Sequence, residues 1–167
     1  ALPFELMDSE RSFNVRRVAR SLPVNPYLKA LFPANDRPVN QTIDAEYLAP
    51  ALIRTGGSIE AVDTDGKPSP LGTTNFVHAL TPETPGSVHY FVQTSRDFRV
   101  DDAAIAHMQI DAGTRIQPQD IEAVELIEQR VARFGDPRRE ISTPADAGAI
   151  HIRRRLSRQI AAEQDSG

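Results

Sequence analysis

Two of the four histidines of this 167-residue chain lie in one short stretch, NFVHALTPETPGSVHYFVQTSRDF, which has the apolar character of two strands. On the first predicted strand His78 shares a face with Phe76, and on the second His89 shares a face with Phe91. An imidazole in such a place can bond within a core, coordinate a metal, shuttle a proton or bind a substrate. Spacing alone favours hydrogen-bonded core residues over metal ligands for both histidines.

Asp120 is the third candidate for chemistry, in the helix predicted for residues 119–134. On a wheel of roughly 100° per residue it falls on the centre line of an apolar stripe. The stripe consists of Val124, Ile127, Val131 and Phe134. A carboxylate buried there needs a cation, a proton or several hydrogen bonds to offset its desolvation.

Two alternatives for Asp120 stay open at this point. It could join two strand histidines in the two-histidine, one-carboxylate set that leaves iron open positions for oxygen. It could instead cap the exposed amides at the start of a helix beside Pro118. Periodicity alone slightly favours the cap.

The composition excludes several classes of protein. With 40% hydrophobic and 25% charged residues, the chain suits one globular domain over residues 1–167. A net charge of −4 gives no electrostatic footprint for nucleic acid, and no apolar run approaches the ~20 residues of a membrane span. Because the chain has no cysteine, it can hold neither a disulfide nor a cysteine-ligated cluster, and we expect a cytoplasmic location.

The order of elements predicts an α+β fold in which an antiparallel sheet is followed by helices. Strands are expected in a hairpin over 2–18, at 39–47, in a pair at 51–55 and 58–62, and on both sides of a turn at 81–86. Helices are expected at 25–32, 103–116 and 119–134, and in a last helix whose apolar stripe is Ala149, Ile152, Leu156 and Ile160. Gly56–Gly57 is predicted to form a bulge or turn, Pro118 to bend or restart the helix, and Gly135 to end it. His107, His151 and the run Arg153–Arg155 are expected at the surface.

A series of motifs resembles the C-terminal catalytic domain of Rieske non-haem iron oxygenases of the vanillate O-demethylase type. The matching segments are HALTPET (78–84), SVHYF (87–91), SRDF (95–98), the pair Asp101–Asp102, QDIEAVELIEQR (119–130) and DAGAIHIRRRL (146–156). The resemblance implies a helix-grip fold, in which a curved antiparallel sheet surrounds a pocket that a long C-terminal helix closes.

The resemblance also implies an activity. Such an oxygenase hydroxylates or O-demethylates a small aromatic substrate with O2 at a mononuclear Fe(II), which receives electrons from a Rieske [2Fe-2S] cluster. Asp120 matches the family's carboxylate iron ligand, and His78 matches a pocket histidine that binds the substrate. Phe76, Ile43 and Tyr47 would shape that pocket, and His89 would be a framework residue. A reductase component and a homo-oligomer, a trimer in the family, are the implied partners.

Two family features are missing from the sequence. The Rieske cluster needs cysteine–histidine pairs, and the other two iron ligands are histidines that precede the strands in the family. Here Leu6-Met7-Asp8 matches that ligand motif only superficially, because no histidine follows before His78. The chain also opens on a strand-like segment without Met. We therefore expect the catalytic-domain portion of a longer oxygenase, with the Rieske domain outside this chain. The rival hypothesis is a non-catalytic helix-grip module that binds an apolar or aromatic small molecule without metal.

Overall fold

In the computed structural model of the chain, residues 4–48, 50–134 and 142–165 are described. They divide into two compact units. The first unit comprises residues 1–100 and 145–167, and the second comprises residues 101–144. The prediction of a single domain stays a prediction, and each unit is described below by itself.

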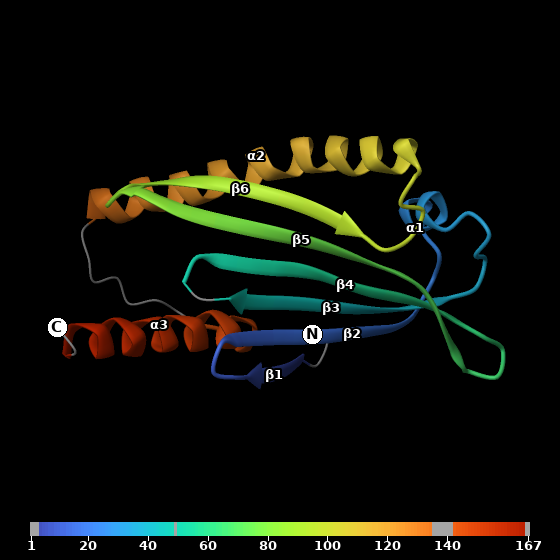
Figure 1. The fold of residues 1–167 in the computed structure, drawn as a ribbon, viewed down its shortest axis with the longest axis horizontal. Coiled ribbons are helices and arrows are strands. Elements are labelled where there is room, and N and C mark those ends of the chain that lie inside the picture. Colours follow the sequence, from blue (N-terminus) through green and yellow to red (C-terminus); the bar gives the residue numbers. More distant parts are fainter. Residues whose placement is uncertain (1–3, 49, 135–141, 166–167) are drawn as a thin grey trace. The chain divides into compact units, whose positions relative to one another are not determined.

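The first unit is built on a six-stranded antiparallel sheet in which the strands follow chain order (Figure 1). The strands are β1 (Phe4–Asp8), β2 (Ser12–Leu22), β3 (Val39–Leu48), β4 (Leu52–Val62), β5 (Pro68–Thr84) and β6 (Ser87–Arg96). The pair of strands predicted at 51–55 and 58–62 is wrong, because β4 runs through both segments. The predicted turn at 81–86 is also too long, since β5 continues to Thr84.

Strand β4 remains one strand because Gly56 and Gly57 adopt positive φ angles of 130° and 148°. A Cβ at Gly57 would lie 1.9 Å from the carbonyl oxygen of Thr42, and one at Gly56 would lie 2.1 Å from that of Thr74. The β3–β4 ladder is interrupted beside Ile43 and resumes in the same register. The glycine pair is therefore a point of close backbone approach inside a strand, not a turn.

Helix α1 (Pro26–Leu31) covers one end of the sheet. It begins at Asn25, whose Oδ1 accepts a hydrogen bond from the amide of Leu28 at 2.8 Å. Leu28 is buried with Val39 of β3 and Ile59 of β4, which lie on the same face of the sheet. This cluster is the core of the first unit at that end.

Helix α3 (Ala147–Asp165), preceded by a 3-10 turn at Pro144–Asp146, packs on the same face of the sheet at β2. The ring of His151 stacks on Phe13 with 4.0 Å between centroids. Gly148 lies so close to Val15 that an added Cβ would be 2.7 Å from its Cγ2. The predicted stripe through Ala149 and Ile160 is wrong, because α3 buries Gly148 and Arg155 instead.

The opposite face of the sheet carries a polar network across its inner strands. Asp44 is buried on β3 and accepts hydrogen bonds from Asn14 Nδ2 at 3.0 Å and Arg16 Nε at 2.8 Å. Burial acts to raise the pKa of Asp44, but these hydrogen bonds and the charges of Arg16 and Arg54 outweigh it, so the pKa lies below its ordinary value. Arg54 in turn pairs with Glu46 at 2.9 Å.

The second unit contains the helix α2 (Ala103–Phe134). Asp102 caps its start, since its Oδ1 accepts a hydrogen bond from the amide of Ala104 at 3.0 Å. The predicted restart at Pro118 is wrong, because the helix continues through that residue. Because Pro118 has no backbone N–H, the carbonyl of Thr114 loses the helical hydrogen bond that residue 118 would otherwise donate. At the neighbouring carbonyl, that of Arg115, the Gln119 side chain supplies a donor at 3.0 Å.

The helix end predicted at Gly135 lies outside the described residues. Across the described ranges, the helices are too short or too polar to span a lipid bilayer.

Replacing Gly57 by alanine is expected to lower the free energy of unfolding by about 3 kcal/mol, because the new methyl would overlap the Thr42 carbonyl at a disfavoured φ. Gly86→Ala is the matched control, since no atom lies within 4 Å of a Cβ there. Urea denaturation measures both. Equal stability of the two variants would contradict the close approach.

Asp44→Asn is expected to cost about 2 kcal/mol of stability at neutral pH, because it removes the charge that Arg16 and Asn14 bond. A carboxyl with a lowered folded pKa stabilises above its unfolded pKa of about 3.9, and that stability is lost as the pH falls through the folded pKa. The difference in the free energy of unfolding between wild type and Asp44→Asn should therefore shrink to zero in this acid range. Asp36→Asn, at an exposed ion pair with Lys29, should change little at any pH.

Candidate substrate-binding site

The predicted pocket residues share one face of the sheet, which we call the site face. Tyr47, Ile53, His78 and Val92 are successive partners in one row across β3, β4, β5 and β6. Residues directly opposite one another in antiparallel strands project from the same face. The next row contains Ala45, Thr55, Phe76 and Thr94. Ile43 lies two positions along β3 from Ala45, so it projects from the site face as well.

The centre of the site face is open between helices α1 and α3. Ile43 is 40% exposed and Ala45 is exposed, although the β3 residues at both ends of this face, Val39 and Tyr47, are buried. Phe76 and His78 are half-buried on the neighbouring strand. The hydroxyl of Tyr47 donates to the carbonyl of Pro50 at 3.1 Å, so this residue presents its ring and not its polar end. The first unit thus offers an apolar surface with a few polar groups, the usual lining of a small-molecule site.

His78 is held at both ring nitrogens. Its Nε2 lies 3.1 Å from Oγ1 of Thr55 on β4, and its Nδ1 lies 2.6 Å from the hydroxyl of Tyr90 on β6. The rings of His78 and Tyr90 are parallel within 9°, with 5.9 Å between centroids. Sequence reasoning missed Thr55 and Tyr90, because only the strand register brings them diagonally beside His78. The one available signal was Tyr90's place in a strand motif next to His89.

His89 lies on the opposite face of the sheet from His78. It pairs with Thr81, one strand position out of phase with the His78 row, and its side chain is 58% exposed. Its Nε2 lies 3.7 Å from Oε1 of Glu83. The structure therefore does not bring the two histidines together, and a metal site containing both is ruled out. The expectation that His89 faces inward is wrong.

Asp120 lies on α2 in the second unit, and it is exposed. The apolar stripe forms on this helix, but three of its four side chains are exposed too, with Val124 at 65% and Ile127 at 62%, and Val131 is half-buried. Burial within the unit therefore gives no reason for a cation beside Asp120. No three His, Cys, Asp or Glu side chains of the described segments come close enough together to hold a metal ion.

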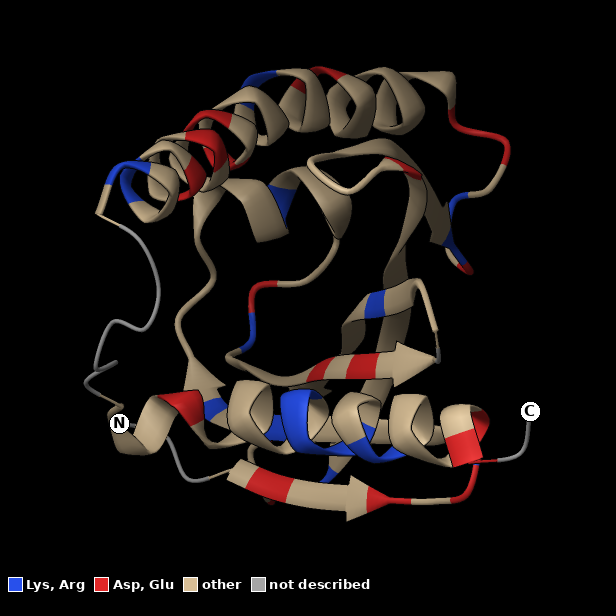
Figure 2. Cartoon of the chain, turned by 90° about the vertical axis from the view of Figure 1, so that its left-hand side faces the viewer, with Lys and Arg blue, Asp and Glu red and all other residues tan. Residues whose placement is uncertain are grey.

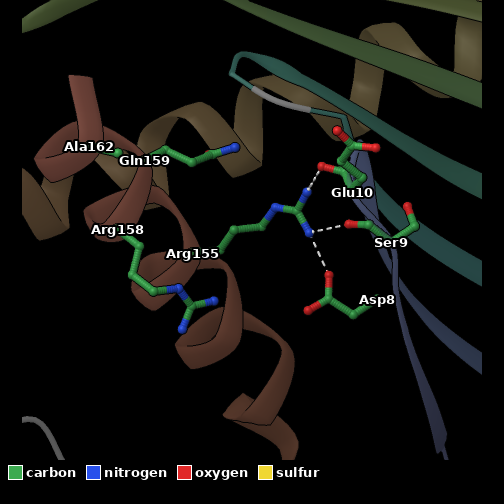
Figure 3. A pocket seen from close by; sticks show the side chains of 7 residues that line it. All are labelled: Asp8, Ser9, Glu10, Arg155, Arg158, Gln159 and Ala162. Carbon is green, nitrogen blue, oxygen red and sulfur yellow. Dashed lines mark hydrogen bonds and ion pairs between the residues drawn. The ribbon is translucent and has the colours of Figure 1, made fainter. Parts of the chain in front are cut away.

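An open groove of about 610 Å³ lies elsewhere in the first unit, between the β1–β2 turn and α3 (Figure 3). Its lining residues are Asp8, Ser9, Glu10, Arg155, Arg158, Gln159 and Ala162. None of the predicted site residues is among them. This groove is thus separate from the open centre of the site face.

Arg155 fastens α3 to the β1–β2 turn at the base of this groove. Its side chain is 9% exposed, and its guanidinium contacts the carboxylate of Asp8 and the carbonyls of Ser9, at 2.7 Å, and Glu10. His151 adds a second contact to Asp8, at 2.8 Å. Figure 2 shows the Lys and Arg positions of α3 beside the Asp and Glu positions of β1. The surface placement predicted for Arg155 is therefore wrong, and Asp8 is engaged in a structural contact.

Comparison with solved structures gives the class of fold. Apo dicamba monooxygenase matches 96% of this chain and 51% of its own, with a TM-score of 0.80 and 20% identity. Dicamba monooxygenase bound to 3,6-dichlorosalicylic acid matches 96% of this chain and 48% of its own, with a TM-score of 0.78 and 19% identity. The predicted α+β, helix-grip class of fold is thereby confirmed.

Sequence comparison gives the family. Residues 1–162 match the vanillate O-demethylase oxygenase C-terminal domain, and the chain belongs to this family. The oxygenase component of chloroacetanilide N-alkylformylase from Rhizorhabdus wittichii (strain DC-6 / KACC 16600) is 32% identical over 133 residues. The match covers 77% of this chain but 37% of that relative. The chain thus spans little more than a third of the relative's length and about half of the dicamba monooxygenase chains.

Arg155→Met is expected to lower the free energy of unfolding by about 2 kcal/mol, because it leaves the carbonyls of Ser9 and Glu10 and the carboxylate of Asp8 without the cation that bonds them. Arg154→Met removes the same charge from an exposed position of the same helix and should cost less than about 0.5 kcal/mol. Thermal unfolding followed by circular dichroism compares the two. A loss of similar size in both variants would refute the assignment of a buried role to Arg155.

Proposed function

We propose that this chain is the substrate-binding portion of the catalytic domain of a Rieske-type oxygenase that hydroxylates or O-demethylates a small aromatic compound. The observation that carries the proposal is the family match over residues 1–162. The relative named as an oxygenase component adds support, because such a component works with an electron-supplying partner. We therefore infer a reductase as partner and O2 as co-substrate, in a cytoplasmic homo-oligomer, which in this family is a trimer.

The site face supplies the proposed substrate wall. Phe76, Ile43 and Tyr47 offer flat and branched apolar surface, which suits an aromatic ring. His78, in the row between Ile53 and Val92, is the polar group of that wall and orients the substrate. The apolar residues thus set the shape of the substrate that fits, and the imidazole of His78 sets the orientation of that substrate.

Mononuclear Fe(II) fits the described residues only in part. Asp120 offers carboxylate oxygens, which suit a two-histidine, one-carboxylate iron site, and its exposed position leaves it accessible to ligands from outside this chain. The two histidine ligands would have to come from a part of the protein outside this chain, because the described residues hold no cluster of three potential metal ligands. A Rieske [2Fe-2S] cluster likewise needs residues beyond this cysteine-free sequence. No reaction step is assigned to iron on these residues alone.

A second candidate function is a helix-grip module that binds an apolar or aromatic molecule without metal. It is favoured by the same incomplete ligand set and by the hydrogen bonds that already hold His78. The two functions differ in what the intact protein contains, since an oxygenase needs stoichiometric iron and consumes O2. A protein that binds an aromatic ligand but takes up neither would support the second candidate.

Asp120→Ala, introduced into the full-length protein that contains this chain, is expected to lower the bound iron severalfold, because a three-ligand site loses its carboxylate. Iron content is measured by atomic emission after anaerobic loading with Fe(II). Asp111→Ala is the matched control, since Asp111 is another exposed acid of α2. If both variants hold as much iron as wild type, Asp120 is not a ligand.

A further inference from the structure

Three side chains that are diagonal neighbours on adjacent strands form a hydrogen-bonded chain on the site face. The hydroxyl of Tyr90 on β6 lies 2.6 Å from Nδ1 of His78 on β5, and Oγ1 of Thr55 on β4 lies 3.1 Å from Nε2. In a neutral imidazole one nitrogen donates and the other accepts. The hydroxyls of Tyr90 and Thr55 can each donate or accept, so two proton arrangements are chemically possible for this hydrogen-bonded chain.

The two distances favour one arrangement over the other. Bonds donated by a hydroxyl are short, with a mode near 2.7–2.8 Å, whereas bonds donated by N–H to oxygen are longer, near 2.9–3.0 Å. The 2.6 Å contact therefore fits a Tyr90 O–H that donates to Nδ1, and the 3.1 Å contact fits an Nε2–H that donates to Thr55. A phenol is also a stronger donor than an aliphatic alcohol, since its pKa is about 10.

We propose that Tyr90 is a positioning residue that fixes His78 as the Nε2–H tautomer, so that Thr55 presents its hydroxyl hydrogen to the substrate. In this arrangement His78 orients the substrate through Thr55, because Oγ1 of Thr55 accepts from Nε2 of His78 and the Thr55 hydroxyl hydrogen remains for an acceptor on the substrate. Thr55 has no second partner among the described residues, and it is half-buried in the row beside Phe76. This proposal rests on the proposed function, because it names the substrate contact of the same site.

The proposal determines which substrate atoms the site selects. A hydroxyl hydrogen next to an apolar wall favours an oxygen acceptor on the aromatic compound, such as an ether, carbonyl or carboxylate oxygen. A substrate that offers an N–H donor at that point would leave the Thr55 hydrogen unpaired and would bind less well. Tyr90 acts through His78 and does not itself need to touch the substrate.

The tautomer is tested by nitrogen-15 NMR of His78 in the ligand-free chain at a pH where the ring is neutral. Nδ1 is expected to give the signal of an unprotonated nitrogen that accepts a hydrogen bond, and Nε2 that of a protonated nitrogen. Tyr90→Phe should move the Nδ1 signal downfield, toward a nitrogen without a bonded donor. Tyr27→Phe, which removes a hydroxyl from helix α1, should leave both signals in place.

A protonated Nδ1 in the wild type would overturn the proposal, and so would an unchanged Nδ1 signal in Tyr90→Phe. The wild-type spectrum alone decides the tautomer if the variant does not fold. The NMR measurement needs neither iron nor substrate. The proposed tautomer can therefore be refuted while Asp120 still binds iron, and it can be confirmed while Asp120 does not bind iron.

The role of Thr55 is tested in the intact oxygenase with the aromatic substrate that it turns over. Thr55→Val is expected to raise KM about five- to tenfold with little change in kcat, because one neutral hydrogen bond to the substrate is lost. Thr55→Ser keeps the hydroxyl and should restore the wild-type KM. Equal KM values for wild type, Val and Ser variants would remove Thr55 from the substrate contact.

Discussion

The close approach of β4 to both neighbouring strands at Gly56 and Gly57 is the constraint on which the site face depends. A side chain at either position would overlap a carbonyl oxygen of β3 or β5. Two residues without Cβ atoms let β4 stay one strand and keep its register on both sides of the interrupted ladder. Tyr47 and His78 therefore remain in one row, while Ile43 stays exposed beside the gap.

Much of the fold follows from local patterns in the sequence. Alternation of apolar residues gave five of the strand regions, and the capping side chains of Asn25 and Asp102 mark where two helices begin. Local rules failed where a residue suits two structures. A glycine pair can end a strand or let one pass close to its neighbours, and Pro118 can stop a helix or remain inside it when a side chain such as Gln119 supplies a donor nearby.

The site could be predicted as a set of strand residues but not as a network. Ile43, Tyr47, Phe76 and His78 share a face because alternation has a period of two, which the sequence displays. The partners of His78 depend on the register between three strands, and a shift of one residue would have placed them on the other face. Arg155 shows the same limit, since its burial depends on the β1–β2 turn at the far end of the chain.

The contact of α3 with the β1–β2 turn has a consequence for folding. It joins residues separated by 143 to 147 positions in the chain. The entropy lost on closing so long a loop is recovered only after the intervening strands have assembled, so this contact belongs to a late and slow step. Until this contact forms, the β1–β2 hairpin lacks its anchor to α3, and β1, the outer strand of the sheet, can pair with other chains.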